Sequence, residues 1–536
     1  MNVLDEVETE RPSFPDRIQY RRLRAPQANG QTLQIPTFRD IDQTFTSNLA
    51  TVLKLRNVPI AATTLGKLTD QARQEIIRIA TARVQQYSDV KFESLVNKPI
   101  VMSGHQPKLF HPGVWYKNFS LSELGSRLDA TPINLVVDND ICGVAAIQVP
   151  RFHDQQASLH SIPFDDVGDN LPFEARNIEN MDVFKSFGSR VRAAIAPMVD
   201  RPIIVPLWNK AKDLTLPSMS MGDALARCRH ALELDSGLRT LEVLLSEIAS
   251  TAAFATFAWH LIEHREQFLK SYNEALLEYR RIHKIRSNSH PVPELETQDE
   301  WCEVPFWIWP TESAVRGRLF VRERSSGYEL TNRRGLSVHL DSKSFADQFL
   351  DLSNQGVAIR PKALTNTMFC RLVLSDLFLH GIGGAKYDQL TDVIIEDFFG
   401  VAPPEYMTLT ATMKLPAPVP LAYPNQVTDI KQTLRELRFH PETQLDNLDE
   451  SSEPWVQQKH EWIKKVGSGS RLERHQAIES ANLNLQPALE PKRVKLVERK
   501  QVLESQLRNS QILGSREFSF CLFPLELVDE LKKMAS

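Results

Sequence analysis

The stretch that decides the fold is residues 98–140, which read KPIVMSGHQPKLFHPGVWYKNFSLSELGSRLDATPINLVVDND. The apolar run at 100–103 follows a proline and predicts a short buried strand, and the run at 131–137 predicts a second one. Between them, residues 114–128 carry Val and Leu at helical spacing. Strand, helix and strand within about 40 residues form one βαβ unit with parallel strands and a right-handed crossover. The sequence therefore predicts an α/β fold with a parallel sheet.

Outward from this unit the chain divides into three regions. Residues 1–97 begin with an extended arm rich in Pro, Arg and Gln and continue as a helical lead. Residues 98–424 are expected to form the α/β core, with a helical insert at about 222–284. The Pro-rich stretch 416–424 marks the next boundary. Residues 425–536 are charged and carry Leu and Val at heptad-like spacing, which predicts a C-terminal helical hairpin or coiled coil.

Some further elements are expected along the core and the C-terminal region. A helix over roughly 178–197 precedes a strand predicted at 201–208. Another helix is expected over about 362–379. The C-terminal helices are expected to be interrupted at Pro487 and Pro491, because proline lacks the backbone donor that a helix interior needs.

Composition excludes some classes of protein. The 536 residues are 42% hydrophobic and 24% charged, with a formal net charge of −4, so no overall basic footprint indicates a nucleic-acid partner. No stretch approaches the roughly 20 apolar residues of a membrane span, and the acidic start has no signal-peptide core. The five cysteines are scattered, without any C-x-x-C, which suits a reducing compartment and predicts a cytoplasmic protein.

The loop 104–113 is the first candidate site, because ligands bind beyond the carboxyl ends of parallel strands and at helix N-termini. It carries His105 and His111, either of which can bind phosphate or transfer a proton near neutral pH. Gln106 lies in the same loop, and Lys117 is expected in the first helical turn, where it can neutralise a phosphate or carboxylate. The alternative is a polar loop that merely caps a strand.

Acidic residues follow the adjacent strand. Asp138 and Asp140 close the strand at 131–137, where carboxylates can bind Mg²⁺, a ribose or a substrate amine. The alternative is a solvated turn together with Asn139. Arg360, after another predicted strand, is a candidate anion clamp.

The turn at 380–386, His-Gly-Ile-Gly-Gly-Ala-Lys, is a third candidate. It satisfies neither G-x-x-x-x-G-K-[ST] nor G-x-G-x-x-G, so it is no recognised phosphate loop. Lys386 begins the next helix and can face a ligand. A helix C-cap followed by a tight turn is the structural alternative.

A further motif, His260-Leu-Ile-Glu-His264, matches the H-x-x-E-H pattern of inverted zinc peptidases. Helical spacing places both histidines on one face. The helix is long and charged, with Arg265 and Glu266 next to the motif, so a solvated helical face is favoured and no metal is predicted there.

Taken together, these residues give the sequence a distant resemblance to the cysteine-adding enzymes of bacillithiol synthesis, the BshC family, over most of the chain. Departures are His105 where the family has its first Gln, and Gly-Ala-Lys-Tyr at 384–387 where it has Gly-Pro-Gly-Glu. The matching segments are 101–110 with Gly113, Tyr116 and Lys117; 132–140; and 357–361 followed by 381–384 and 398–404.

The resemblance implies a Rossmann-like core, ATP or ADP as a ligand with Mg²⁺, a homodimer formed through the C-terminal helices, and a ligase reaction. That reaction forms a carbon–nitrogen bond between cysteine or a similar amino acid and a small sugar-derived acceptor. The residues expected to be catalytic are His105, His111, Asp138 and Asp140. The residues expected to bind substrate or nucleotide are Gly104, Gln106, Gly113, Tyr116, Lys117, Arg360, Gly383, Gly384 and Lys386.

Two alternatives keep the same core. The segment from His105-Gln106-Pro107 to Tyr116-Lys117 is also similar to the start of WbqC-like proteins, which implies a sugar-modifying acyl- or nucleotidyltransferase. The other alternative is a non-catalytic assembly protein that retains a nucleotide-binding core.

Overall fold

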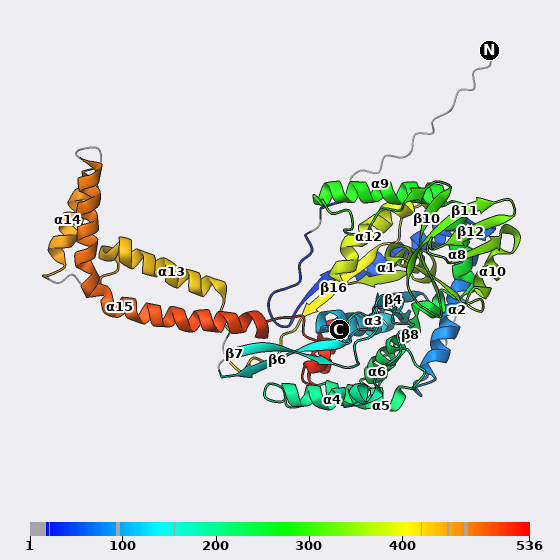
Figure 1. Ribbon diagram of the computed structural model, residues 1–536, viewed down its shortest axis with the longest axis horizontal. Coiled ribbons are helices and arrows are strands. Elements are labelled where there is room, and N and C mark those ends of the chain that lie inside the picture. The colour runs from blue at the N-terminus through cyan, green and yellow to red at the C-terminus, as the bar shows by residue number, and fades with distance from the viewer. Residues whose placement is uncertain are drawn as a thin grey trace, which may run out of the picture.

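The computed structural model describes residues 18–20, 22–92, 97–154, 156–419, 421–446, 450–465 and 470–536. Much of the arm predicted at the N-terminus, residues 1–17 and 21, lies outside the described residues. The described chain forms an α/β body from which a helical arm projects (Figure 1). No helix in these ranges is long and apolar enough to cross a membrane.

The central sheet confirms the predicted parallel α/β core. Within the described ranges its neighbouring strands are, in order, β1 (Gln31–Ile35), β16 (Tyr406–Thr412), β15 (Leu377–His380), β4 (Ile100–His105), β5 (Thr131–Val136) and β8 (Leu241–Leu244). The strands from β16 to β8 are mutually parallel, and β1 runs antiparallel to β16 at one edge. The strands expected at 100–103 and 131–137 are thus adjacent and parallel.

Side chains alternate across this sheet, so both faces are buried. Ile100 and Met102 of β4 belong to one hydrophobic core, and Val101 between them belongs to the other. The first core is covered by α2 (Leu65–Val84), α8 (Ala252–Glu263), α9 (Arg265–His283), α11 (Ala363–Phe369) and α12 (Ile382–Ile394). The second is covered by α3 (Pro112–Arg127), α4 (Met181–Ile195), α5 (Ile204–Leu214), α6 (Met221–Asp235) and α16 (Leu527–Ala535). Helix α1 (Ile41–Leu55) contributes to both cores.

A second, antiparallel sheet packs on the first core. In the described chain its strand order is β13 (Ser337–Asp341), β12 (Gly327–Thr331), β11 (Gly317–Arg324), β10 (Trp301–Pro310) and β14 (Val357–Pro361), and β9 (Thr297–Gln298) also pairs with β10. Shorter elements complete the body: the strand pairs β2 (Pro59–Ile60) with β3 (Thr63–Thr64) and β6 (Ala146–His153) with β7 (Gln156–Pro163), and helices α7 (Leu245–Ile248) and α10 (Phe345–Asp351).

Several of the expected elements are wrong. The strand expected at 201–208 is the start of helix α5, which buries Ile204, Leu207, Trp208 and Ala211 at helical spacing. Strand β8 interrupts the insert that was expected to be helical at 222–284. Likewise α11 ends early, continues as a π-helical turn at Cys370–Leu374, and leads into strand β15 where a helix was expected.

The arm consists of α13 (Pro424–Phe439), α14 (Glu453–Lys464) and α15 (Arg471–Leu513). Helix α15 continues through Pro487 and Pro491, so the predicted interruption there is wrong, although Figure 1 shows the helix bent within its length. Proline kinks a helix where the missing donor and the ring disturb the preceding turn. The body anchors the arm through Ala157 of β7, whose backbone N donates to Asn509 Oδ1 at 2.9 Å.

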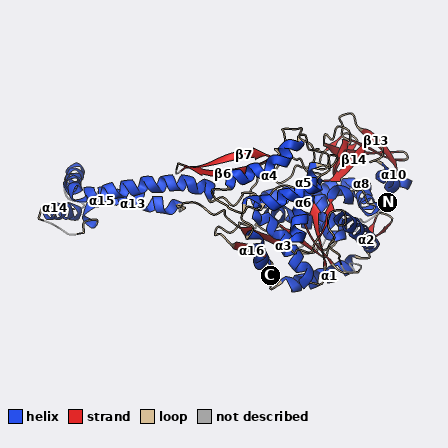
Figure 2. Cartoon of the chain, turned by 90° about the horizontal axis from the view of Figure 1, so that it is seen from below, coloured by secondary structure: helices blue, strands red, loops and turns tan. Residues whose placement is uncertain are grey.

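After the arm the chain returns to the body. Phe520 and Leu522 are fully buried in the second core, and α16 packs against α3. Figure 2 shows α16 on the body and α13, α14 and α15 extending away from it. Residues 514–536 therefore pack with the body, although the sequence placed them in the same region as the arm.

Candidate functional site

The candidate site lies at the carboxyl edge of the central sheet, where the strand order reverses. Strand β4 is followed by α3 and by β5 on one side, whereas β15 is followed by α12 and by β16 on the other side. Right-handed crossovers in opposite directions place α3 and α12 on opposite faces. The N-terminus of α12 directly follows β15, whereas the start of α3 lies against β16, where Thr410 Oγ1 donates to the Gly113 carbonyl at 3.2 Å. Open α/β sheets bind their ligands at such a switch point.

Lys117 of α3 lies directly beneath the loop that follows β4. Its side chain is buried, and Nζ donates to the carbonyl oxygen of Gly104 at 2.7 Å. It forms no ion pair with any residue that the structure describes. Burial lowers its pKa to about 7. Because a buried ammonium without a counter-ion is unfavourable, this arrangement suits a group that receives an anion from solution.

His105, the last residue of β4, is partly buried and has its Nδ1 3.2 Å from the carbonyl oxygen of Gln106. Burial, with the charge of Lys117, lowers the pKa of His105 to about 3. The imidazole is therefore neutral at physiological pH. Because Nδ1 donates to the Gln106 carbonyl, Nε2 carries the lone pair and can accept a hydrogen bond from a ligand, but it is a weak base.

His111 has a structural task at the start of α3. Its Nδ1 accepts a hydrogen bond from the backbone N of Gly113 at 3.0 Å, which makes it the N-cap, and Pro112 follows at the first helical position. Gly113 has no room for a side chain, because a Cβ would collide with the Ala411 carbonyl and the Arg516 guanidinium. These two residues fix the start of the helix that carries Lys117.

The acidic turn after β5 is tied to this loop. Gln106 Nε2 donates to Asp140 Oδ2 at 3.1 Å. Asp138 is buried, and its carboxylate accepts hydrogen bonds from the Ser246 backbone N at 3.0 Å and from the Ser246 hydroxyl at 2.5 Å. Burial, together with Glu174, raises the pKa of Asp138 to about 7. Its carboxyl group therefore changes protonation near neutrality.

Residues of the second sheet and its neighbouring segments hold the acidic turn after β5 in place through hydrogen bonds. Arg360 of β14 forms a two-pronged ion pair with Glu174, with Nη2 2.8 Å from Oε2 and Nε 3.1 Å from the same oxygen. It is therefore already neutralised and does not stand as a free anion clamp. Asn139 Nδ2 donates to the Pro361 carbonyl at 2.9 Å, and Arg316 donates to the Asn139 carbonyl at 3.0 Å.

The glycine-rich turn forms the N-terminus of α12. Gly381 is its N-cap, and a Cβ built at Gly381 or Gly383 meets no atom within 4 Å, so this turn has open space around it. Gly384 is exposed, but a Cβ there would lie 2.6 Å from His380 Nδ1. Lys386 lies near His283 of α9, whose pKa is lowered by burial and by that lysine.

Tyr116 is part of the packing of α3. Its ring is fully buried, and its hydroxyl donates to the Met534 carbonyl at 2.8 Å and accepts from Gln34 Nε2 at 2.7 Å. These contacts join α3 to α16 and β1. The structure thus brings His105, Gln106 and Lys117 together with the acidic turn, while Tyr116 faces away into the core.

Sequence reasoning missed residues at this edge. Ser246 and Glu174, which hold Asp138 and Arg360, come from segments that no motif marked. His380 ends β15 and pairs with Asp388 of α12. Its place directly before Gly381 is a signal, but the prediction of a helix up to residue 379 and a turn from His380 onward hides the strand that this histidine ends.

The H-x-x-E-H motif does come together at the junction of α8 and α9. Its His260, Glu263 and His264 have potential ligand atoms within 4.8 Å of one another. However, His260 Nδ1 accepts a hydrogen bond from the Ala61 backbone N at 3.1 Å. In the neutral ring Nε2 then carries the proton, so no free lone pair faces a metal. We therefore do not assign a metal to this cluster.

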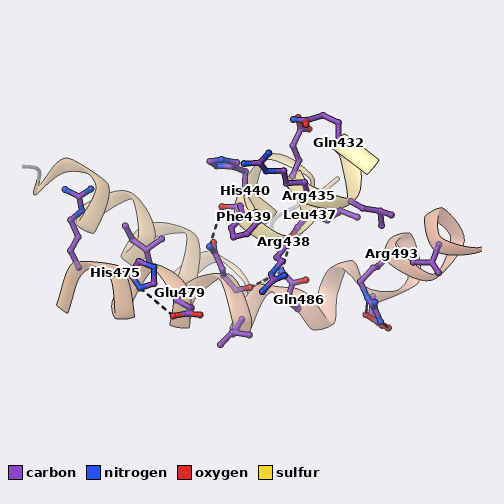
Figure 3. A pocket seen from close by; sticks show the side chains of 18 of the residues that line it. Gln432, Arg435, Leu437, Arg438, Phe439, His440, His475, Glu479, Gln486 and Arg493 are labelled. Carbon is purple, nitrogen blue, oxygen red and sulfur yellow. Dashed lines mark hydrogen bonds and ion pairs between the residues drawn. The ribbon is translucent and has the colours of Figure 1, made fainter. Parts of the chain in front are cut away.

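A groove of about 1400 Å³ lies on the arm, between the end of α13 and α15 (Figure 3). Arg435 and Arg438 line it from α13, His440 from the position that follows this helix, and Gln486 and Arg493 from α15. Its two sides are joined by a hydrogen bond from Gln486 Nε2 to the Leu437 carbonyl at 3.0 Å. The groove belongs to the arm and contains no residue of the sheet edge.

Comparison with known proteins adds no assignment. Neither a scan against protein-family models nor a search of curated proteins gives a match.

Proposed function

We propose that this chain is a nucleotide-dependent ligase of the BshC kind, which joins cysteine or a similar amino acid to the amine of a small sugar-derived acceptor. One observation carries the proposal: the buried ammonium of Lys117, without an ion-pair partner among the described residues, at the switch point of a parallel sheet. A phosphate placed there gains a counter-ion that the protein has already desolvated.

The residues present fit a nucleotide phosphate. Open space at Gly381 and Gly383 lets a ligand approach the backbone of α12, and the ammonium of Lys117 lies at the Gly104 carbonyl at the end of β4. The amide of Gln106 can donate a hydrogen bond to a phosphate or carboxylate oxygen without adding charge, and His105 Nε2 can accept one from a ligand N–H or O–H group. ATP or ADP is the proposed nucleotide.

In the reaction, ATP supplies a phosphoryl or adenylyl group that activates the carboxyl group of the amino-acid donor. The protein's part is to hold the reactants in contact and to neutralise the phosphate through Lys117. Asp138 and Asp140, which follow β5, would hold the donor ammonium group or Mg²⁺. The hydrogen bond between Gln106 and Asp140 would hold the proposed phosphate-binding loop at a fixed distance from the acidic turn that binds the amino-acid donor.

A hydroxylamine trap tests this proposal without knowledge of the natural acceptor. ATP, Mg²⁺, L-cysteine and hydroxylamine are incubated with the protein, and cysteinyl hydroxamate is measured. We expect hydroxamate that depends on ATP and cysteine, and its loss in Lys117→Met. Binding of ATP without hydroxamate would instead favour a WbqC-like transferase. Absence of stabilisation by ATP, ADP, amino acids or sugars would favour a non-catalytic assembly protein.

We also propose that two copies of the chain pair through the arm. Leu472, Leu483 and Val494 of α15 follow one another at eleven-residue spacing and are 66%, 64% and 43% exposed. Eleven residues make three helical turns, so Leu472 and Leu483 share one face of the segment before Pro487, and Val494 follows the two prolines. Exposed apolar residues in line on a helix are typical of a helix–helix interface.

A further inference from the structure

We infer that His380, held by Asp388, is the residue that accepts the proton when the new carbon–nitrogen bond forms. The inference rests on the proposed ligase function and identifies a proton acceptor within that same site. It depends on the position of His380, the direction of its ring, and the opening above one ring nitrogen.

The position is the switch point itself. His380 is the last residue of β15, and the register that pairs Leu379 with Ser103 places it level with Gly104 of β4. Because side chains alternate along a strand, His380 points to the α12 face together with Phe378, whose ring centroid is 4.7 Å away. His380 thus approaches the edge from the side opposite Lys117.

The ring direction is set by a buried carboxylate. His380 Nε2 lies 2.7 Å from Asp388 Oδ2, and both side chains are almost fully buried. Asp388 also accepts from Arg371 Nη1 at 2.7 Å. Although burial opposes it, Arg371 and His380 hold the pKa of Asp388 below its usual range. An ionised Asp388 accepts the Nε2 proton and leaves the lone pair on Nδ1.

The lone pair faces the first turn of α12. No described residue donates a hydrogen bond to Nδ1. The atom lies under Gly384, where a Cβ would approach it to 2.6 Å. Gly384 and Gly383 are exposed, so the absence of side chains at this turn leaves Nδ1 open to a ligand at the helix N-terminus.

The other histidines of this edge are less suited to the task. The pKa of His105 is lowered to about 3 by burial and by Lys117, so it holds a proton poorly at neutral pH. His111 uses its Nδ1 to cap α3. His380 combines an ionised partner on one nitrogen with an open lone pair on the other, which is the arrangement of a general base.

The acceptor amine attacks the carbonyl carbon of the activated donor, and a C–N bond forms. The bond from that carbon to the phosphate oxygen breaks, and the phosphate-containing group leaves with the electron pair. The proton released by the amine passes to His380 Nδ1, and the imidazolium is stabilised by Asp388. The charged or titratable groups around the ring are Asp388, Asp392, Arg371 and Tyr406.

The test compares two nucleophiles on the same activated donor. Hydroxylamine attacks readily without a base, whereas the amine of glucosamine needs its proton removed. In His380→Gln we expect cysteinyl hydroxamate to form at nearly the parent rate, and the amide with glucosamine to form about 100-fold more slowly or less. Equal loss with both nucleophiles, or no loss with glucosamine, overturns the inference. If the unmodified protein forms no hydroxamate, the proposed function falls and the inference falls with it.

A glycine pair provides the matched control. Gly384→Ala places a methyl group against Nδ1, whereas Gly383→Ala adds the same group one residue earlier with no atom within 4 Å. We expect Gly384→Ala to slow glucosamine coupling selectively, as His380→Gln does, and Gly383→Ala not to show that selectivity. Identical selectivity for the two alanine variants contradicts an opening at Nδ1.

A pH profile separates a chemical role from a structural one. The Asp388→Asn variant loses the charge that stabilises the imidazolium, so the pH at which glucosamine coupling reaches half its maximum should fall. A purely structural Asp388 would change the rate without moving that pH. An unmoved profile in a folded variant therefore overturns the role given to Asp388.

Discussion

At the scale of single residues, the site is defined by ionisable groups that the fold buries, which makes their charged forms less favourable than in water. Lys117 is a buried ammonium with its pKa lowered to about 7, and Asp138 is a buried carboxyl with its pKa raised to about 7. Both values result mainly from burial, and Glu174 adds to the shift of Asp138. Groups that titrate near neutrality in such surroundings are typical of functional sites.

The shift of Asp138 predicts a pH-dependent effect on stability. The folded protein keeps the Asp138 proton up to a pH of about 7, whereas the unfolded chain loses it near pH 4, so raising the pH across this window disfavours the folded state. The Asp138→Asn variant has no titratable group at this position, so its stability lacks this pH dependence, and it can keep the contacts with Ser246. We expect its free energy of unfolding, relative to the parent, to increase between pH 5 and pH 8 in urea titrations.

The control for this prediction is Asp140→Asn, which changes a more exposed carboxylate in the same turn. Its free energy of unfolding relative to the parent should not follow the same rise. A difference between Asp138→Asn and the parent that is constant from pH 5 to pH 8 would contradict the raised pKa.

At the scale of elements, the sequence predicted the first βαβ unit because its strands are apolar runs that a proline or a turn delimits, with an amphipathic helix between them. The loop 104–113 and the acidic turn were likewise predictable as strand-end segments. Strands β8 and β15 were not, because each has only four residues and directly adjoins helical sequence. Periodicity cannot distinguish so short an apolar run from part of a buried helix.

The residues that contact Arg360 and Asp138 could not be predicted from the sequence, for a related reason. Glu174 neutralises Arg360 across a separation of 186 residues, and Ser246 reaches Asp138 across 108. Such pairs depend on how the second sheet and the insert pack against the central sheet. The resemblance to the BshC family predicted the site segments, and the roles of their residues stay a prediction.

The contact between α3 and β16 gives a prediction at this scale. In Gly113→Ala the added methyl group collides with the backbone of Ala411 and with Arg516, so α3 must shift. We expect a loss of about 1–3 kcal/mol in the free energy of unfolding, as for other overpacked sites. Gly383→Ala, at a helix start with open space, is the control and should leave stability within about 0.5 kcal/mol of the parent. Equal stabilities for the two variants would contradict tight packing at Gly113.

At the scale of the whole molecule, the chain combines an α/β body with an arm that leaves it and returns. The return of the chain through Phe520 and α16 means that both ends of the arm are fixed to the body. This connection suits an arm that sets the distance and orientation between two bodies.

The proposed dimer can be measured directly. Leu483→Glu places a charge in the middle of the exposed apolar face of α15, and we expect the mass from light scattering after size exclusion to fall from that of two chains to that of one. Leu277→Glu, at a side chain that is 67% exposed on α9 of the body, is the matched control and should leave the mass unchanged. A parent protein that is already a single chain at micromolar concentration would contradict the proposal.

The effect of ADP on the stability of Lys117→Met tests whether Lys117 binds the nucleotide phosphate. Without ADP this variant should be more stable than the parent at pH 7, because it removes a buried charge that has no ion-pair partner among the described residues. ADP at 100 times its dissociation constant should stabilise the parent by about 2.7 kcal/mol and the variant very little. Lys108→Met, at an exposed position in the same loop, should respond like the parent. A Lys117→Met variant that is less stable than the parent without ADP, or that keeps the full ADP stabilisation, would contradict the account.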